Sequence, residues 1–349
     1  MSGLRRKDLS KHYDQVIHSL KGGRLLPFLG AGASLCGPGA SRLGAKPGSP
    51  VQQHLPFPNA GGGQGAAGSP SQGEAPPSGW QLASYLAGKV AYPPECVASR
   101  SDTRAGLNLL EVAQHFEILN DELSLYDTLH EVFDRDFAFS PVHEFLARLP
   151  SVLKAKKWNY PHQFIVSTNY DDLMERAFRA LPDPEPCDLV VYDAKEGSTS
   201  GGRFLYIAPG AAPVVVDVPQ TFLLPVGERS VILKIHGAVA RNSKPEQDSY
   251  VITEDHYFDY PFYNEIPINL RQEFVNRRFL FLGYSLSDWN VRMIFRRISK
   301  EHVLSKTAWT VTNKHDPLQK MIWENRGVEY IVADLADYVH DLEIKLSAS

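Results

Sequence analysis

Short apolar runs alternate with helix-like segments along most of this chain. Apolar runs of strand length lie at 25–29, 164–167, 231–235, 279–282, 309–312 and 330–332. Segments with apolar residues three and four positions apart follow several of these runs, at 171–180, 288–299, 317–325 and 335–346. Alternating short strands and helices are typical of a parallel sheet covered on both faces. The pattern therefore predicts an α/β fold built on a doubly wound parallel sheet.

Helical periodicity dominates the segment between the first two predicted strands. Helices are predicted at 13–20, 82–90 and 141–149, with two more inside 107–133 that break near Asn120 and Asp121. We expect residues 80–153 to form a helical cap or insert layer. Residues 188–227 contain several prolines and are expected to form irregular β insertions. The whole chain, 1–349, is expected to be a single domain.

Residues 37–79 differ in composition from the rest of the chain. Glycine, proline, serine and glutamine dominate this stretch, with runs such as Ala60–Gly63. A segment of this kind cannot bury enough apolar surface to offset the entropy of ordering it. We therefore predict a mobile, low-complexity insertion.

Charge and cysteine content narrow the class of protein. The formal net charge is −4, which argues against direct nucleic-acid binding. The three cysteines, Cys36, Cys96 and Cys187, form no CxxC pair, so a reducing compartment is expected and a four-cysteine zinc ribbon is not. The sequence shows neither a signal peptide nor an apolar run of about 18 residues. The expectation is a cytoplasmic protein with no membrane association.

Four of the predicted strands end in a glycine or polar signature. The strand at 25–29 runs into Gly30–Ser34, and the strand at 164–167 into Thr168–Asp171. The other two run into His236 and Gly237, and into Gly283–Asp288. Because ligands bind outside the carboxyl ends of strands in open parallel sheets, one crevice is expected to collect Gly30, Asn169, His236 and Ser285. This is the arrangement of a Rossmann-like nucleotide site.

The glycine turn after the first strand has two interpretations. Gly30, Ala31 and Gly32 would let the backbone approach a diphosphate, and Ser34 would add a hydroxyl donor. The alternative is a tight structural turn without a ligand, since GxG turns occur wherever a strand must turn sharply.

The polar residues after the second strand also carry two interpretations. Asn169 offers a donor and an acceptor, so it could hold a ribose hydroxyl or a water molecule. Asp171 could accept from ribose or orient Asn169. The alternative is an Asx turn that caps the helix starting near Asp171.

The remaining strand ends supply a base and further polar contacts. His236 could act as a general base, because the ordinary pKa of histidine lies near neutrality; the alternative is a structural role. Ser285 could contact phosphate or ribose, and Asp288 could accept from the adenosine ribose. Capping of the next helix is the alternative for Asp288.

These motifs, in this order, resemble the sirtuin superfamily, and the nearest likeness is to the sirtuin-like NAD hydrolases of bacterial anti-phage defence. The matching stretches are Leu26–Ser34, Phe164–Asp172, Leu233–Gly237, Thr253–Tyr257 and Phe281–Asp288. The resemblance implies a catalytic pair, Asn169 and His236, with Asp171 beside it. It further implies an NAD site lined by Gly30, Ala31, Gly32, Ser34, Thr168, Gly283, Ser285 and Asp288.

The resemblance also bears on the reaction. Protein-deacylating sirtuins carry a zinc ribbon whose cysteines this chain lacks, so no metal is expected. NAD glycohydrolysis is therefore the leading candidate, with NAD as substrate and nicotinamide and ADP-ribose, or its cyclic form, as products. The second candidate is protein deacylation or ADP-ribosyl transfer, and the third is a non-catalytic sensor of NAD or ADP-ribose.

Uncontrolled loss of NAD would kill the host cell, so such an enzyme needs a control. The resemblance implies an effector that acts by depleting NAD during infection. We expect gating by homo-oligomerisation or by a partner that senses infection, for which a ring ATPase and an Argonaute-type protein are the candidates.

Overall fold

The computed structural model describes residues 3–36, 74–90, 92, 107–194, 202–216, 221–223, 227–258, 266–284, 308–313 and 316–349. The helix predicted at 288–299 lies outside the described residues, as do Ser285, Asp288, Cys96 and residues 37–73 of the predicted insertion. The last residues of that stretch are described, and Pro76 and Pro77 are buried there.

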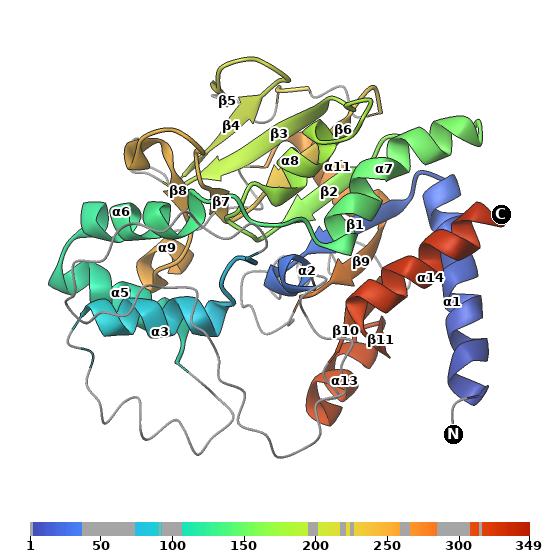
Figure 1. The fold of residues 1–349 in the computed structure, drawn as a ribbon, viewed down its shortest axis with the longest axis horizontal. Helices are drawn as coiled ribbons and strands as arrows, with labels where there is room; N and C mark the ends of the chain where they lie inside the picture. Colours follow the sequence, from blue (N-terminus) through green and yellow to red (C-terminus); the bar gives the residue numbers. More distant parts are fainter. Residues whose placement is uncertain are drawn as a thin grey trace.

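A mostly parallel sheet forms the centre of the described structure (Figure 1). Its strands are β1 (Leu25–Leu29), β2 (Phe164–Ser167), β3 (Cys187–Asp193), β4 (Arg203–Ile207), β5 (Val214–Val216), β6 (Ser230–Lys234), β9 (Arg278–Leu282), β10 (Ala308–Thr312) and β11 (Val328–Val332). They lie in the order β11-β10-β9-β1-β2-β6-β3-β4-β5. Pairing is parallel from β11 to β3, and β4 and β5 extend the sheet in antiparallel fashion.

Helices cover both faces of this sheet. One face packs against α1 (Gly3–Lys21), α7 (Pro141–Ala155), α8 (Leu173–Arg179) and α14 (Leu335–Ser347), and the other against α11 (Ile268–Asn276) and α13 (Pro317–Glu324). Strand β1 shows the alternation, since Leu25 and Leu29 face the first group and Leu26 and Phe28 the second. The predicted doubly wound α/β fold is confirmed.

Strand β3 corrects the expectation for residues 188–227. These residues were expected to be an irregular insertion, but β3 belongs to the central sheet and pairs in parallel with β6. The apolar run of β3 is Leu189–Tyr192, and the buried Asp188 lies directly before it. The structure compensates that charge with Arg229, whose Nη2 lies 2.9 Å from Asp188 Oδ1.

A helical cap stands beside the carboxyl ends of the strands. It comprises α3 (Gly79–Lys89), α5 (Leu109–Leu119) and α6 (Glu122–Phe133), which share their own apolar core. Asp121 accepts from the Ser124 amide at 2.7 Å, so the predicted helix break lies where α6 is capped. Helix α7, in contrast, packs with the sheet.

The cap meets the sheet through the short pair β7 (Gly237–Ala238) and β8 (Ser249–Tyr250). Tyr250 and Val239 from this region are buried with the cap helices. In Figure 1 the cap lies on one side of the sheet, while α1 and α14 lie on the other. Among the described helices, none has both the length and the apolar character needed to cross a bilayer.

Candidate functional site

The strands that carry the four motifs are neighbours in the sheet. Their order is β9-β1-β2-β6, and all three pairings are parallel. Leu29 is paired with both Leu282 and Ser167, and Ser167 with Lys234. The turns that follow therefore lie side by side at one edge, as the sequence predicted for Gly30, Asn169 and His236. Ser285 lies outside the described residues.

The glycines let two of these turns pack against each other. Gly30 donates its amide to Leu282 O at 3.1 Å, and Gly32 donates to Gly283 O at 2.9 Å. Gly283 has a φ of +63°, and a Cβ there would lie 2.1 Å from Ala33 N. Two amides expected to face a diphosphate thus bind the neighbouring turn. The close contact of the two turns explains the glycines by itself, and contact with NAD stays a prediction.

The Asn169 side chain is held in one orientation. It is only 7% exposed, and its Nδ2 donates to Gly30 O at 3.2 Å and to Ser34 Oγ at 3.1 Å. Because a carbonyl oxygen can only accept, the amide cannot be reversed without losing the first bond. Its Oδ1 is buried and has no hydrogen-bond partner among the described residues. The asparagine therefore presents an acceptor that the described protein does not use.

Ser34 connects Asn169 to Asp171. It lies on the short helix α2 (Ala31–Leu35), is 2% exposed, and donates its hydroxyl to Asp171 Oδ2 at 3.1 Å. The other oxygen, Asp171 Oδ1, accepts from the Leu173 amide at 3.1 Å, as an Asx turn requires. Asp171 thus forms an Asx turn just ahead of α8, whose N-cap is Asp172, and is linked to Asn169 through Ser34; a role in catalysis stays a prediction.

A buried lysine, which sequence reasoning missed, supports the same turn. Lys234 is 1% exposed, and its Nζ donates to the Asp171 carbonyl oxygen and lies 3.4 Å from Glu175 Oε1. The ion pair offsets the cost of burying each charge. A lysine inside the apolar run 231–235 was the available signal. Lys234 ties the turn after β2 to the strand that leads to His236.

His236 lies where β6 turns toward the cap. It is 3% exposed, and its carbonyl oxygen accepts from Val251 N at 2.9 Å. Gly237 follows with a φ of +84°, and a Cβ there would lie 2.1 Å from Ser249 O. The Tyr257 ring, on α9 (Glu254–Phe258), lies 5.7 Å from the imidazole. Tyr257 is a further candidate that sequence reasoning passed over, although it ends one of the matching stretches.

Thr168 and Asp172, before and after Asn169, anchor the turn that follows β2. Thr168 donates its amide and its hydroxyl to Leu29 O, at 3.1 and 3.3 Å, which ties β2 to β1. Asp172 lies between Arg176 and Arg241, each 3.5 Å away. Burial, with Glu175 nearby, raises the pKa of Asp172 to about 6 against the lowering effect of the two arginines.

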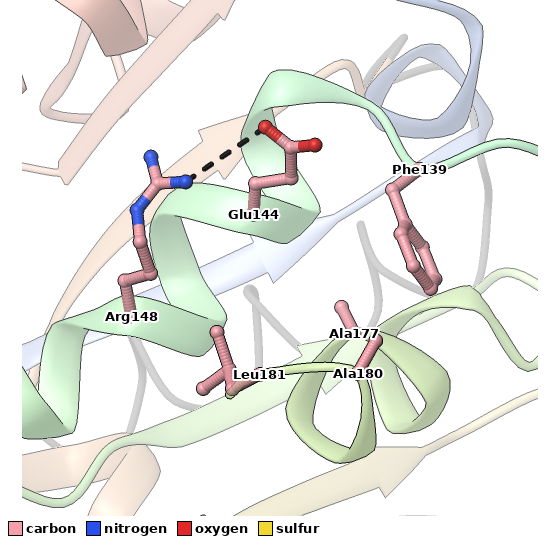
Figure 2. Close-up of a pocket in the computed structure, with 6 residues that line it drawn as sticks. All are labelled: Phe139, Glu144, Arg148, Ala177, Ala180 and Leu181. Atoms are coloured by element: carbon pink, nitrogen blue, oxygen red, sulfur yellow. Dashed lines mark ion pairs between the residues drawn. The ribbon is translucent and has the colours of Figure 1, made fainter. Parts of the chain in front are cut away.

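A separate hollow lies between α7 and α8, away from the strand ends. It measures about 190 Å³ and is lined by Phe139, Glu144, Arg148, Ala177, Ala180 and Leu181 (Figure 2). Arg148 and Glu144 form an ion pair at its rim, 3.8 Å apart. Pockets for drug-sized ligands usually measure about 300–1,000 Å³, so this hollow is too small for a dinucleotide. Within the described part of the chain, no three His, Cys, Asp or Glu side chains are grouped to hold a metal ion.

This chain is similar to one family model and to two known proteins. Residues 163–331 match the family model described as a SIR2-like domain. The NAD(+) hydrolase ThsA of Acinetobacter baumannii (strain 532279) is 29% identical over 160 residues, covering 46% of this chain and 24% of that protein. Defense-associated sirtuin 2 of Bacillus subtilis is 22% identical over 232 residues, covering 64% of this chain and 19% of that protein. The chain thus spans about a quarter or less of these relatives.

Solved structures of Sir2 enzymes are also similar, at low scores. One, described as a structural basis for the mechanism and regulation of Sir2 enzymes, is 12% identical, covers 96% of this chain and 97% of its own, and has a TM-score of 0.39. A Sir2 homologue variant in complex with ADP-ribose is 12% identical, covers 96% of both chains and has a TM-score of 0.40. The fold described above rests on the sheet topology and not on these scores. The match of residues 163–331 to the SIR2-like domain model, with the two relatives, confirms the sirtuin-like resemblance drawn from the motifs.

Proposed function

We propose that this chain is an NAD glycohydrolase whose catalytic residues are Asn169 and His236. The observation that carries the proposal is the fixed amide of Asn169. Its buried Oδ1 has no hydrogen-bond partner among the described residues, and the strand before it, β2, adjoins β6, the strand that leads to His236. The match to a protein named an NAD(+) hydrolase supports hydrolysis over the other reactions of NAD.

The reaction breaks the bond between C1′ of the ribose and the nicotinamide nitrogen. The electron pair of that bond moves onto the cationic ring, so nicotinamide leaves neutral and needs no strong general acid. Positive charge develops on the ribose, and a water oxygen then bonds to C1′. Asn169 Oδ1 accepts from that water or from a ribose hydroxyl and so positions it. His236 takes the released proton, directly or through a ribose hydroxyl.

The binding residues follow the sirtuin resemblance. Gly30, Ala31, Gly32 and Gly283 form the turns that would lie against the diphosphate, and Thr168 lies beside them. Ser285 and Asp288 are proposed for ribose and phosphate contacts. Asp171 acts on Asn169 through Ser34 and is proposed as a part of the catalytic centre that does not itself touch water. NAD enters as substrate, and no metal is used in the reaction.

The decisive experiment incubates the purified chain with NAD and quantifies nicotinamide. Asn169→Ala or His236→Ala is expected to lower turnover at least about a thousandfold, about 4 kcal/mol in activation free energy, with the fold intact. Matched controls are Asn325→Ala and His340→Ala, which change the same residue types at exposed positions and should leave turnover unchanged. Full turnover in both site variants would remove the assignment.

The competing functions predict different products. Deacylation requires an acylated peptide and yields O-acyl-ADP-ribose, and ADP-ribosyl transfer leaves ADP-ribose on a protein. Mass spectrometry separates both from free ADP-ribose and from its cyclic form. A non-catalytic sensor would bind NAD or ADP-ribose saturably without releasing nicotinamide.

We also propose that the enzyme is a defence effector that depletes NAD in infected cells and is gated by assembly. The name of the Bacillus subtilis relative supports a role in defence. Gating would come from homo-oligomers or from a partner such as a ring ATPase or an Argonaute-type protein. Light scattering combined with the nicotinamide assay tests this, and a monomer with full constitutive activity would contradict it.

A further inference from the structure

A fully buried histidine lies behind the proposed catalytic asparagine. His143, at the third position of α7, is 1% exposed. Its amide donates to Ser140 Oγ at 3.4 Å, and the Ser140 amide donates to His143 Nδ1 at 3.2 Å. This is a capping box, in which Glu or Gln usually holds the position of His143. The histidine accepts from the Ser140 amide through Nδ1 and also brings a second nitrogen.

The capping box fixes where the imidazole carries its proton. A backbone amide is always a donor, so Nδ1 must be an acceptor and the ring proton must lie on Nε2. Burial, with a smaller effect from Lys234, lowers the pKa of His143 to about 3, against the raising effect of Glu175. The ring is therefore neutral at physiological pH. Its Nε2, which carries the proton, lies 3.5 Å from Ser34 Oγ.

The direction of every proton around Ser34 follows from this. The hydroxyl receives a hydrogen bond from Asn169 Nδ2 at 3.1 Å and one from His143 Nε2. Its single proton must then point to Asp171 Oδ2, 3.1 Å away. Two donors and one acceptor thus surround Ser34, and no other rotation of the hydroxyl satisfies all three equally well.

We propose that His143 is a positioning residue for Asn169, which fixes the Ser34 hydroxyl and through it the face that the Asn169 amide turns toward the ligand. The inference rests on the proposed function, in which Asn169 Oδ1 accepts from water or ribose. His143 touches only Ser34 and Ser140 in this network and is not a catalytic residue. Its position explains why a capping residue on the helix behind the turn is a neutral donor instead of a carboxylate.

Loss of the Nε2 donor loosens the orientation without removing it. Ser34 keeps its bonds to Asn169 and Asp171 but loses the contact that holds its hydroxyl from the side of α7, so the Asn169 amide is held less firmly. Turning the amide over would present Nδ2 to the ligand in place of Oδ1, so a donor would stand where the reaction needs an acceptor. The expected defect is therefore in the chemical step and not in NAD binding.

The kinetics of four variants test this hydrogen-bond network of His143, Ser34 and Asn169. His143→Leu is expected to lower kcat about tenfold with KM for NAD changed less than about twofold, and His143→Gln, which keeps a donor near the Nε2 position, restores most of kcat. Ser34→Ala lowers kcat, and adding His143→Leu to it costs no further activity, because the route is already broken. Losses that multiply, or a glutamine variant as slow as the leucine variant, would overturn the inference.

A buried histidine far from the site supplies the control. His12 is 2% exposed and its Nε2 hydrogen-bonds Tyr338 at 2.8 Å, so His12→Leu removes a comparable side chain from the core. It is expected to lower the free energy of unfolding and leave kcat unchanged. A loss of kcat equal to that of His143→Leu would make the effect one of stability alone and contradict the positioning role.

Nuclear magnetic resonance tests the same hydrogen-bond network without measuring turnover. In protein labelled with 15N-histidine, His143, identified by its absence in His143→Gln, is expected as a neutral ring protonated on Nε2 between pH 8 and 5, and His143→Leu is expected to shift the Asn169 side-chain amide resonance. A ring protonated on Nδ1, or an unshifted amide, would overturn the inference. If the wild-type chain releases no nicotinamide but shows the Nε2 tautomer and the Asn169 amide shift, the proposed function fails and the positioning of Asn169 stands.

Discussion

The buried histidines His12 and His143 lie in two regions that use the same chemistry differently. Where α1 packs on α14, His12 forms a hydrogen bond with Tyr338. The centres of the His12 and Trp309 rings lie 5.6 Å apart in an edge-to-face arrangement. The Nδ1 of His12 is buried without a hydrogen-bond partner among the described residues. At the strand ends both nitrogens of His143 are partnered, and the network continues to Asn169.

The difference between the two histidines indicates a role for the buried polar groups at the strand ends. Both regions carry the cost of burying an imidazole. At the α1–α14 contact that cost yields one link between two helices. At the strand ends the same kind of group fixes the orientation of a side chain whose acceptor the described protein does not use. Removing polar groups at the strand ends should therefore affect both stability and chemistry.

The largest effect on stability is expected when the buried cation at the strand ends is removed. Lys234→Met leaves Glu175 and the Asp171 carbonyl without their partner, so the free energy of unfolding should fall by about 3–5 kcal/mol. Lys154 is the control, because its ion pair with Glu185, 2.7 Å apart, involves a lysine side chain that is 46% exposed. Lys154→Met should cost less than about 1 kcal/mol. Urea unfolding measures both, and equal losses would show that burial at the strand ends is unimportant.

A smaller effect is expected from the glycine that separates the two turns. Gly283→Ala places a Cβ 2.1 Å from Ala33 N at a φ of +63°, so the β1 and β9 turns must move apart. We expect a loss of about 3 kcal/mol. Gly210→Ala has a similar φ, +74°, but meets nothing within 4 Å. It should cost about 1 kcal/mol, from backbone strain alone. Thermal unfolding compares the stability of the two variants. A Gly283→Ala variant as stable as Gly210→Ala would refute close packing of the turns.

The smallest effect concerns acid stability, where the two histidines should act alike. Burial lowers the pKa of His12 from 6.5 to about 4 and is the main cause that lowers that of His143 to about 3. The unfolded chain binds these protons first, so stability should fall as pH drops below about 6.5 and keep falling to the folded pKa values. His12→Gln should reduce this slope by about 1.4 kcal/mol per pH unit between pH 6 and 4. Denaturant titrations across this range measure it, and an unchanged slope would mean that His12 is already charged in the fold.

Much of the fold followed from the sequence because it depends on local pattern. The apolar runs at 25–29 and 164–167 became β1 and β2 without change of bounds. The place of β3 in the central sheet was missed because its partner strand β6 and Arg229, which pairs with Asp188, both lie far along the chain. A charge compensated from a distance leaves no local signature.

The candidate site was likewise only partly predictable from the sequence. Asn169 and His236 could be found because they follow predicted strands directly, and parallel strands end at a common edge. The roles of Ser34 and His143 could not, since their contact joins residues 109 positions apart and depends on a tautomer fixed by a helix cap. Lys234 was visible as a charge in an apolar run, but its partner was not.

The central claim is that the turns after β1, β2 and β6 surround one NAD molecule. The most direct measurement is a crystal structure of the Asn169→Ala variant soaked with NAD, which should bind the dinucleotide without cleaving it. The account predicts the nicotinamide ribose between position 169 and His236, with the diphosphate at the turn that begins at Gly30. NAD bound anywhere else, with these turns unoccupied, would contradict the account.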